Sequence, residues 1–253
     1  MLPDSEKEYL LQFHSIFRNR PEAEQYLYDS WIRMQVVLGW MKLLQQQGVR
    51  KVLELGSNPY YLTLLLKKHF DFELRLANFF SDPSLQSIEK QTIDNGLEKH
   101  EMEYSHFNVE QDSFPYEADT FDCVIFCEIL EHLLLNPDFA LDEIHRILKP
   151  SGYVIVTTPN AARLSNLIQL ARGKNIYANY SPHGIYGRHN REYTFQEVIE
   201  LLKRHSFEIE KSHARNIYPH PFKTRILQKL RPQIWYEHIF VLGRKVVSTN
   251  NRT

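Results

Sequence analysis

Hydrophobic residues recur at helical spacing along the N-terminal part of the chain. Two stretches, at 6–17 and 23–47, show this period, and the second ends at Gly48, since glycine commonly follows a helix. After this break, short apolar runs alternate with further helical stretches. We therefore expect an N-terminal helical cap over residues 1–48 and a second domain over residues 49–247.

The second region alternates between predicted strands and predicted helices. The strand candidates are seven apolar runs at 51–56, 73–78, 101–107, 121–130, 152–160, 207–212 and 238–246. The helix candidates are the periodic segments at 63–70, 84–93, 136–148 and 194–206. Such alternation predicts an α/β fold with a doubly wound, mostly parallel, seven-stranded Rossmann-like sheet. A polar, tyrosine-rich stretch at about 163–193 interrupts the alternation, which indicates an insertion.

The composition is that of an ordinary globular protein, with 43% hydrophobic residues among 253. The 30 basic and 31 acidic residues nearly cancel, so the charge balance does not favour a broad nucleic-acid or membrane surface. No run of about 18 apolar residues occurs, and the N-terminal segment is too charged for a signal peptide. We expect a cytoplasmic protein without a transmembrane segment. The sequence does not determine its oligomeric state.

The first strand candidate ends in the residues from Glu54 to Asn58, directly before a helix. In an open parallel sheet, ligands bind at the carboxyl ends of the strands. A dinucleotide site would need the pattern G-x-G-x-x-G, yet only Gly56 of its three glycines is present. S-adenosylmethionine (SAM) has no phosphate and needs one glycine for close approach and an acid for its ammonium group, which Gly56 and Glu54 supply. An ordinary strand-to-helix turn is the alternative interpretation.

Two longer motifs follow in order, FPYEADTFDCVIFCEILEHL at 114–133 and LDEIHRILKPSGYVIVTTPN at 141–160. With these motifs the chain resembles the class I SAM-dependent methyltransferases of the ubiquinone-biosynthesis and small-molecule type, over about residues 52–207. The resemblance implies that SAM is the cofactor, that S-adenosylhomocysteine is the product, and that the methyl group passes to an acceptor molecule.

The resemblance also implies a set of cofactor contacts. These fall at Arg33, Glu54, Gly56, Asn58, Tyr60, Asn78, Phe79, Asn108, Val109 and Cys127. Glu54 and Gly56 would line the methionine end of SAM. Asn78, at the end of the second strand candidate, would hold the ribose, and Asn108 would meet the adenine amino group.

Four of these positions depart from the family pattern. The family usually has an acid where this chain has Asn78 and Asn108, and glycines where it has Asn58 and Tyr60. An asparagine cannot accept a bidentate pair of hydrogen bonds from two ribose hydroxyls as a carboxylate does. Either the affinity for SAM is lower here, or Phe79 and Tyr60 compensate by packing on the nucleoside. A turn residue without ribose contact is the alternative for Asn78.

Three further positions complete the implied cofactor site. The backbone at Val109 and Cys127 would bracket the adenine and the methyl donor. Arg33, on the N-terminal helix, lies where related enzymes carry a basic residue for the SAM carboxylate. A solvated helix face is the alternative for Arg33.

Methyl transfer is an in-line displacement, so the enzyme positions the acceptor and, for a hydroxyl, removes its proton. The segment from Glu128 to His132 follows the fourth strand candidate and contains two acids and an imidazole. His132 is the first candidate base because imidazole titrates near neutral pH, and His189 is the second catalytic candidate. The alternative for His132 is a packing role at the start of the next helix.

A polar cluster at 181–195, SPHGIYGRHNREYTF, falls within the expected insertion. It supplies the candidate acceptor-binding residues His183, Tyr186, Arg188, Arg191 and Tyr193. Aromatic faces with Arg and His donors suit a hydroxyl-rich or anionic ligand, so we expect a small-molecule or sugar acceptor, methylated at a hydroxyl. The basic segment at 220–232 leaves a lipid-linked acceptor open, with a solvated helix face as the alternative.

Two other functions stay open. The RNA 2′-O-methyltransferases carry a similar E-x-x-E-H motif with a further histidine around a divalent metal. Glu128, Glu131 and His132 match this spacing, and His183 or His189 could complete the site. The chain lacks an appended RNA-binding module and its charge is near neutral, so nucleic acid is disfavoured and the favoured interpretation includes no metal. A non-catalytic binding module with the methyltransferase fold is the second alternative.

Overall fold

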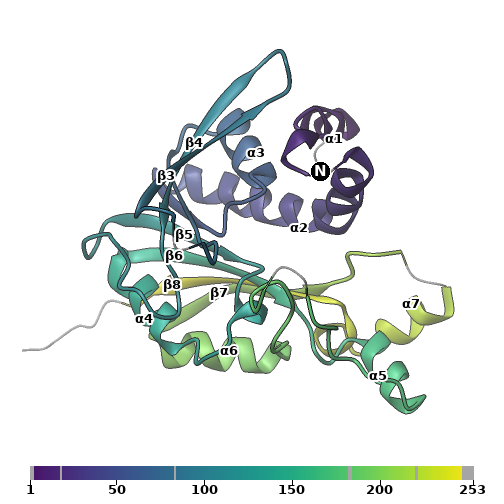
Figure 1. Cartoon of the computed structure of the whole chain (residues 1–253). Helices are drawn as coiled ribbons and strands as arrows, with labels where there is room; N and C mark the ends of the chain where they lie inside the picture. The colour runs from purple at the N-terminus through teal and green to yellow at the C-terminus, as the bar shows by residue number, and fades with distance from the viewer. Residues whose placement is uncertain (1–2, 18, 83, 182–183, 220–221, 247–253) are drawn as a thin grey trace, which may run out of the picture. The chain divides into compact units, whose positions relative to one another are not determined.

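The computed structural model describes residues 3–246 except 18, 83, 182–183 and 220–221. The chain divides into two compact units, residues 1–108 and residues 109–253. Figure 1 shows the elements of each. The expected division into a cap over 1–48 and a domain over 49–247 stays a prediction.

The first unit begins with helices, as the sequence predicts. They are α1 (Asp4–Leu11), the short 3-10 helix η1 (His14–Ile16) and α2 (Arg20–Gln46). The side chain of Asn19 accepts a hydrogen bond from the backbone N–H of Glu22 and so caps the first turn of α2, where Pro21 also lies. Within this part of the chain, α2 buries a long apolar stripe that includes Leu27, Met34 and Met41.

Three parallel strands of the first unit bring the candidate cofactor residues to one edge. These strands are β1 (Lys51–Leu55), β2 (Glu73–Asn78) and β4 (Lys99–His106), and the helix α3 (Tyr61–His69) connects β1 to β2. The register pairs Leu55 with Ala77. Gly56 and Asn78 therefore leave neighbouring strands at the same carboxyl edge, where ligands bind in this class of sheet.

The helix expected at 84–93 was wrong: β3 (Ile88–Asp94) is a strand that pairs antiparallel with β4. Most β3 side chains are at least partly exposed, and the segment accordingly contains mostly polar residues rather than a continuous apolar run. An Asn95-Gly96 turn joins the two strands, with Gly96 at a φ of +83°. Asn-Gly between two short runs is a hairpin signal, and it identifies β3 better than the weak helical period did.

The second unit contains the other four strands, in the order β5-β6-β8-β7. They are β5 (Phe121–Cys127), β6 (Leu148–Pro159), β7 (Phe207–Arg215) and β8 (His238–Lys245). The helices are η2 (Leu130–His132), α4 (Asp138–Ile147), α5 (Leu164–Ala171), α6 (Phe195–Arg204), α7 (Phe222–Gln228) and α8 (Pro232–Trp235). Helices α4 and α6 cover one face of these strands (Figure 1), and His205 at the end of α6 hydrogen-bonds to Asp138 and Asp142 of α4.

The expected α/β, Rossmann-like fold is confirmed, but the strand number and the strand directions differ from the expectation. The described residues form eight strands, and three pairings are antiparallel: β3 with β4, β6 with β8 and β7 with β8. The hairpin at β3 adds the unexpected strand. Strand β8 lies between β6 and β7 and runs antiparallel to both, so parallel and antiparallel pairings occur together in this unit.

The most buried strands of the second unit are β5, β6 and β8. Val124, Ile125 and Phe126 of β5 are fully buried, as are Val154 and Ile155 of β6. Continuous apolar runs of this kind suit strands that are covered on both faces. In the part of the chain that the structure describes, no helix is both long and apolar enough to cross a membrane.

Candidate active site

Glu54, the penultimate residue of β1, is the buried acid of the first unit. Its side chain is almost inaccessible to solvent, and its Oε2 accepts a hydrogen bond of 2.7 Å from the Thr63 hydroxyl on α3. Burial raises the pKa of Glu54 to about 8, although the Thr63 hydrogen bond and nearby Lys67 oppose the shift. A cationic partner close to this buried carboxyl would stabilise its ionised form.

The turn after β1 is built around Gly56. Its φ is +66°, a left-handed conformation that glycine adopts without cost, and its N–H donates to the carbonyl of Ala77 at 2.8 Å. The N–H of Tyr60 closes the turn on the carbonyl of Ser57. Tyr60 is also left-handed, with a φ of +68°, although it has a full side chain. The turn therefore keeps glycine-like backbone geometry at a position where the family resemblance led us to expect a glycine.

Asn78 ties this turn to the end of β2. Its Oδ1 accepts hydrogen bonds from the backbone N–H of Asn58 at 2.9 Å and from the Ser57 hydroxyl at 3.2 Å. Its Nδ2 donates to the phenolic oxygen of Tyr60 at 3.2 Å, and that hydroxyl donates to Gln91 of β3. The three departures at positions 58, 60 and 78 thus form one hydrogen-bonded unit.

The other cofactor candidates of the first unit occupy different environments. Phe79 directly follows β2 and is 37% exposed, and its ring stacks on His106. Asn108 is buried, and Arg33 is half-buried on α2. An exposed aromatic face beside Asn78 is suited to packing on a nucleoside.

In the second unit, the end of β5 carries Cys127 and Glu128. Cys127 is half-buried, as is Val109. Glu128 has a φ of +56°, and its Oε1 accepts hydrogen bonds from the Thr157 hydroxyl and from Nε2 of the buried His238, both at 2.6 Å. Oε1 of Glu128 therefore links the end of β5 to the neighbouring strands β6 and β8.

Glu131, in η2, is fully buried, and only one of its two carboxylate oxygens accepts a hydrogen bond from the described residues. Oε2 accepts a hydrogen bond of 2.9 Å from the Thr158 hydroxyl. Oε1 has no hydrogen-bond partner within the described part of the chain. It lies 4.0 Å from Nε2 of His132. A buried carboxylate oxygen without a partner is costly, so a donor or a cation near Oε1 would be stabilising.

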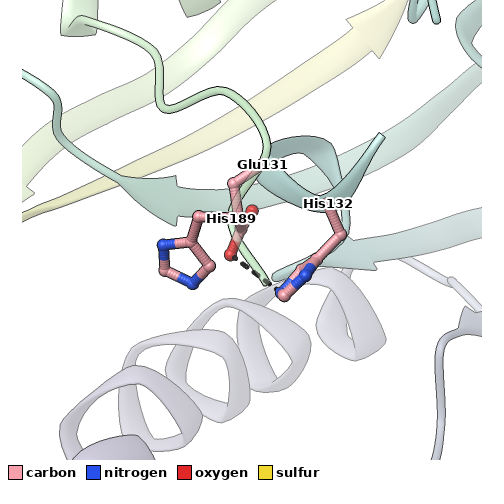
Figure 2. Close-up of side chains that lie close together, drawn as sticks. All are labelled: Glu131, His132 and His189. Carbon is pink, nitrogen blue, oxygen red and sulfur yellow. Dashed lines mark ion pairs between the residues drawn. The ribbon is translucent and has the colours of Figure 1, made fainter. Parts of the chain in front are cut away.

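His132 and His189 lie next to Glu131 with their rings perpendicular and their centroids 5.0 Å apart (Figure 2). Nδ1 of His132 lies 2.9 Å from the backbone carbonyl of Arg188. A carbonyl only accepts, so Nδ1 carries a proton, and in the neutral ring Nε2 keeps its lone pair. Nδ1 of His189 lies 3.0 Å from a carboxylate oxygen of Glu192, and the same reasoning assigns its lone pair to Nε2.

Glu192 and Arg163 support His189. Burial raises the pKa of Glu192, but hydrogen bonds from His189 and Arg163 outweigh burial and bring the pKa to about 2. The hydrogen bond to Glu192 raises the pKa of His189 in turn, against the opposing effect of burial. Both Arg163 side-chain NH groups donate to Glu192, which holds the carboxylate in place.

Backbone and amide bonds tie the loop before α6 to η2. The N–H of Asn190 donates to the carbonyl of Glu131 at 2.7 Å, and the side-chain amide of Asn190 donates to the carbonyls of His132 and Ile185. These bonds hold His189 beside Glu131. The two catalytic candidates, separated by 57 positions in sequence, therefore lie together.

The acceptor-binding candidates differ in their contacts and in their exposure to solvent. The Arg188 guanidinium stacks on Tyr180 and donates to Asn190. Arg191 is exposed, pairs with Glu197 and stacks on Tyr193, which is itself buried.

Two more positions belong to this group. Tyr186 is half-buried. His183 lies outside the described residues. The acceptor-binding role of the whole group stays a prediction.

Sequence reasoning missed the residues that support the two histidines. Glu192 was visible as an acid three positions after His189, but its role depends on the loop conformation. Thr158, which binds Glu131, lay inside an apolar strand motif. Neither carries a sequence pattern of its own.

A family profile described as a methyltransferase domain matches residues 28–212. The chain belongs to this family. The methyltransferase uses SAM, as the motifs at the ends of β1 and β5 implied, and the expected enzymatic activity is confirmed at this level. The ubiquinone-biosynthesis or small-molecule subtype remains a prediction.

Solved structures show the same fold. A SAM-dependent methyltransferase from Archaeoglobus fulgidus is 14% identical, with a TM-score of 0.53 and coverage of 87% of this chain and 99% of that chain. A SAM-dependent methyltransferase from Thermotoga maritima, a possible histamine N-methyltransferase, is 17% identical, with a TM-score of 0.53 and coverage of 92% and 99%. No curated protein sequence matches this methyltransferase.

The residues at the end of β1 are compatible with SAM. Gly56 lies in a left-handed turn, is exposed to solvent and has no side chain of its own. The buried Glu54 side chain is an acid that could pair with an ammonium group, and the exposed ring of Phe79 is a flat apolar surface. The methyltransferase therefore presents an acid, an open glycine and an aromatic face along one edge of its first unit.

Proposed function

We propose that the enzyme transfers a methyl group from SAM to a hydroxyl of a small molecule, sugar or glycan. The observation that carries the proposal is the orientation of His132, whose Nδ1–H is held by the Arg188 carbonyl. The lone pair on Nε2 is thereby available at the Glu131–His132–His189 cluster. A hydroxyl acceptor needs such a group, because it must lose a proton as it attacks.

The proposed reaction needs a methyl donor, a group that accepts the proton of the hydroxyl, and a leaving group. Bound SAM supplies a methyl group on a positively charged sulfur. The acceptor oxygen gives up its proton at the Glu131–His132–His189 cluster, with Nε2 of His132 as the acting atom. The oxygen–carbon bond forms as the sulfur–carbon bond breaks, and S-adenosylhomocysteine leaves. The enzyme contributes orientation and proton removal.

In this proposal, Glu54 and Gly56 hold the methionine end of SAM and Phe79 packs on its nucleoside. The Oδ1 of Asn78 already accepts two hydrogen bonds within the turn, so its contribution to ribose binding is through the shape of the turn. Tyr60 and Asn58 act through the same network.

Four further positions are proposed to contact SAM. Asn108 would meet the adenine, while the backbone at Val109 and Cys127 would bracket the adenine and methyl donor. Arg33 would meet the carboxylate. The family resemblance supports these assignments.

The acceptor would bind to the segment from His183 to Tyr193. Stacked guanidinium groups at Arg188 and Arg191 support an acceptor that carries hydroxyls or a phosphate. A nucleotide-linked or lipid-linked sugar combines both features.

The test is to incubate the protein with methyl-labelled SAM and panels of nucleotide sugars, glycans and small phenols. We expect labelled product from at least one hydroxyl-bearing class, and strong loss of labelling in His132→Asn, which keeps a donor for the Arg188 carbonyl but lacks Nε2. His205→Gln, on a histidine bound to α4, is the matched control. Transfer only to amines, or equal labelling by His132→Asn, would refute the proposal.

A second candidate is transfer to a 2′-hydroxyl of RNA. The convergence of Glu131, His132 and His189 favours it, because the RNA 2′-O-methyltransferases carry a similar motif with a further histidine around a divalent metal. Glu128, the other acid of that motif, is instead bound to Thr157 and His238. A short RNA in the same acceptor panel separates the two candidates, since only the second predicts labelled RNA.

A further inference from the structure

The side chains of Glu131, His132 and His189 converge as a set of potential metal ligands (Figure 2). Each offers one ligand atom, and these atoms lie within 4.8 Å of one another. Donors on one ion with bonds of about 2.1 Å lie roughly 3.0–3.5 Å apart, so an inward movement of about 1 Å would seat an ion. Side-chain rotation of Glu131 and the two histidines covers such a movement.

Both histidines have the hydrogen-bond arrangement of metal ligands. His132 donates from Nδ1 to the Arg188 carbonyl, and His189 donates from Nδ1 to Glu192. A second bond of this type fixes the tautomer and ring orientation of a ligating histidine. Both Nε2 lone pairs are therefore available. Arg163 in turn donates a hydrogen bond to Glu192 and so helps to hold the carboxylate that orients His189.

The buried oxygen of Glu131 gives an independent reason for a cation. Thr158 satisfies Oε2, while Oε1 has no partner in the described part of the chain and its residue is fully buried. Leaving such an oxygen unpaired is costly, and more so when the group is charged. A cation between Oε1 and the two imidazoles would remove this cost.

We propose that Glu131, His132 and His189 bind a divalent transition-metal ion. Two imidazoles and one carboxylate suit Zn²⁺, Mn²⁺, Co²⁺ or Fe²⁺ better than Mg²⁺ or Ca²⁺, which prefer oxygen ligands. Three protein ligands leave coordination positions open for an exogenous oxygen.

The role of the ion rests on the proposed function. An acceptor hydroxyl bound to it would lose its proton to solvent more readily, because a divalent ion stabilises the alkoxide. In the metal-bound protein the Nε2 lone pair of His132 would bind the ion, so the ion would replace the direct proton transfer to His132 while the methylation of a hydroxyl stays the same.

Metal binding is tested without any activity measurement. Protein dialysed against a chelator is titrated with Co²⁺, followed by the visible d–d bands, and with Mn²⁺, followed by electron paramagnetic resonance. We expect one site per chain. In His132→Asn and His189→Asn, which keep a donor for the Arg188 and Glu192 contacts, we expect affinity to fall about 100-fold or more; Glu192→Gln should lower it about 10-fold.

His205→Gln is the matched control, because both nitrogens of His205 are already bound by carboxylates of α4. Its metal affinity should equal that of the wild type. Wild-type protein that fails to bind millimolar Co²⁺ or Mn²⁺, or ligand variants that bind as tightly as the wild type, would overturn the proposal. Circular dichroism of each variant verifies folding, and Glu131→Gln gives a third variant that retains the Thr158 contact.

The metal proposal and the proposed function fail in different ways. A protein that methylates a hydroxyl equally well after chelation, and binds no Co²⁺, retains the proposed function and loses the metal site. A protein that binds Co²⁺ through the cluster but labels no hydroxyl keeps the metal site and loses the function. SAM titration of the chelated protein reports on the cofactor site separately.

Discussion

The side-chain amide of Asn78 donates a hydrogen bond to the phenolic oxygen of Tyr60, 3.2 Å away. Both residues stand where the family resemblance implies other residues, an acid at position 78 and a glycine at position 60. Tyr60 supplies a side chain that reaches back to β2 and on to Gln91 of β3, and Asn78 supplies the donor that a carboxylate lacks. The two departures are therefore coupled, and a change at one site should alter the effect of a change at the other.

A double-mutant cycle measures this coupling. Asn78→Ala removes the acceptor for Ser57 and Asn58 and the donor to Tyr60, all in a buried turn, so we expect it to lower the free energy of unfolding by about 2–3 kcal/mol. Tyr60→Phe should cost about 1 kcal/mol. In urea unfolding, the double variant should lose less than the sum by at least about 0.5 kcal/mol.

Thr194→Ala serves as the control for that cycle. It removes the capping box of α6, in the other unit, and should cost about 1 kcal/mol. Combined with Asn78→Ala, its effect should be additive. Strict additivity between Asn78→Ala and Tyr60→Phe would show that their hydrogen bond contributes nothing.

The buried acid Glu54 predicts a pH dependence of stability. Its pKa is about 8 in the folded protein, against 4.5 for the ordinary side chain, so the folded state binds the proton more tightly. The unfolded state therefore holds fewer protons between these values, and stability falls as pH rises from about 4.5 to 8. Relative to Glu54→Gln, which keeps an acceptor for Thr63, the wild type should lose up to about 1.4 kcal/mol per pH unit in that window.

Chemical unfolding of both proteins at several pH values tests this difference. The Gln variant should be the more stable above pH 8, and the two should converge near pH 4.5. Parallel pH profiles would mean that Glu54 is already ionised in the folded protein at neutral pH.

Glu54 also predicts that SAM binding releases a proton. At pH 7 a carboxyl with a pKa of about 8 is mostly protonated, and the SAM ammonium would favour its charged form. Calorimetric titration in buffers of different ionisation enthalpy should show proton release by the wild type and little release by Glu54→Gln. SAM affinity should rise with pH up to about 8. Equal proton release by both proteins would place the ammonium away from Glu54.

The sequence predicted the elements that bury continuous apolar surface. Strands β1 and β5 and the amphipathic helix α6 lie within the segments whose patterns predicted them. Strand β3 was missed because its side chains are largely exposed, so no apolar period distinguishes it. The Asn78–Tyr60 bond could not be predicted either, since it depends on the register of β1 and β2 and on a left-handed turn residue.

The same distinction holds at the candidate active site. His132 and His189 were recognisable as residue types, but their convergence depends on the amide of Asn190, which fixes the loop to η2. Glu192 acts only through the conformation of that loop. Side-chain networks between distant segments have no local signature, so they emerge only with the tertiary structure.

The proposed role of His132 predicts a kinetic effect without a binding effect. His132→Asn should lower kcat by about 100-fold or more, because it removes the group that acts on the acceptor hydroxyl. SAM affinity, measured by calorimetry, should stay within about twofold of the wild type. Unchanged kcat under conditions where chemistry limits the rate would leave a methyltransferase that acts by positioning alone.

The last prediction concerns acceptor binding by Arg188. Its guanidinium stacks on Tyr180 and donates to Asn190, which leaves further N–H groups available to an anionic or hydroxyl-rich acceptor. Arg188→Gln should therefore raise the acceptor KM by about 10-fold or more while leaving SAM affinity unchanged, since a lost charge-assisted bond costs about 1.5–3 kcal/mol. Arg172→Gln, the same charge change on the exposed residue that ends α5, is the matched control and should behave as the wild type. Equal KM increases in both variants would indicate a general electrostatic effect, and a loss of thermal stability in Arg188→Gln with no change in KM would assign Arg188 a structural role in the loop.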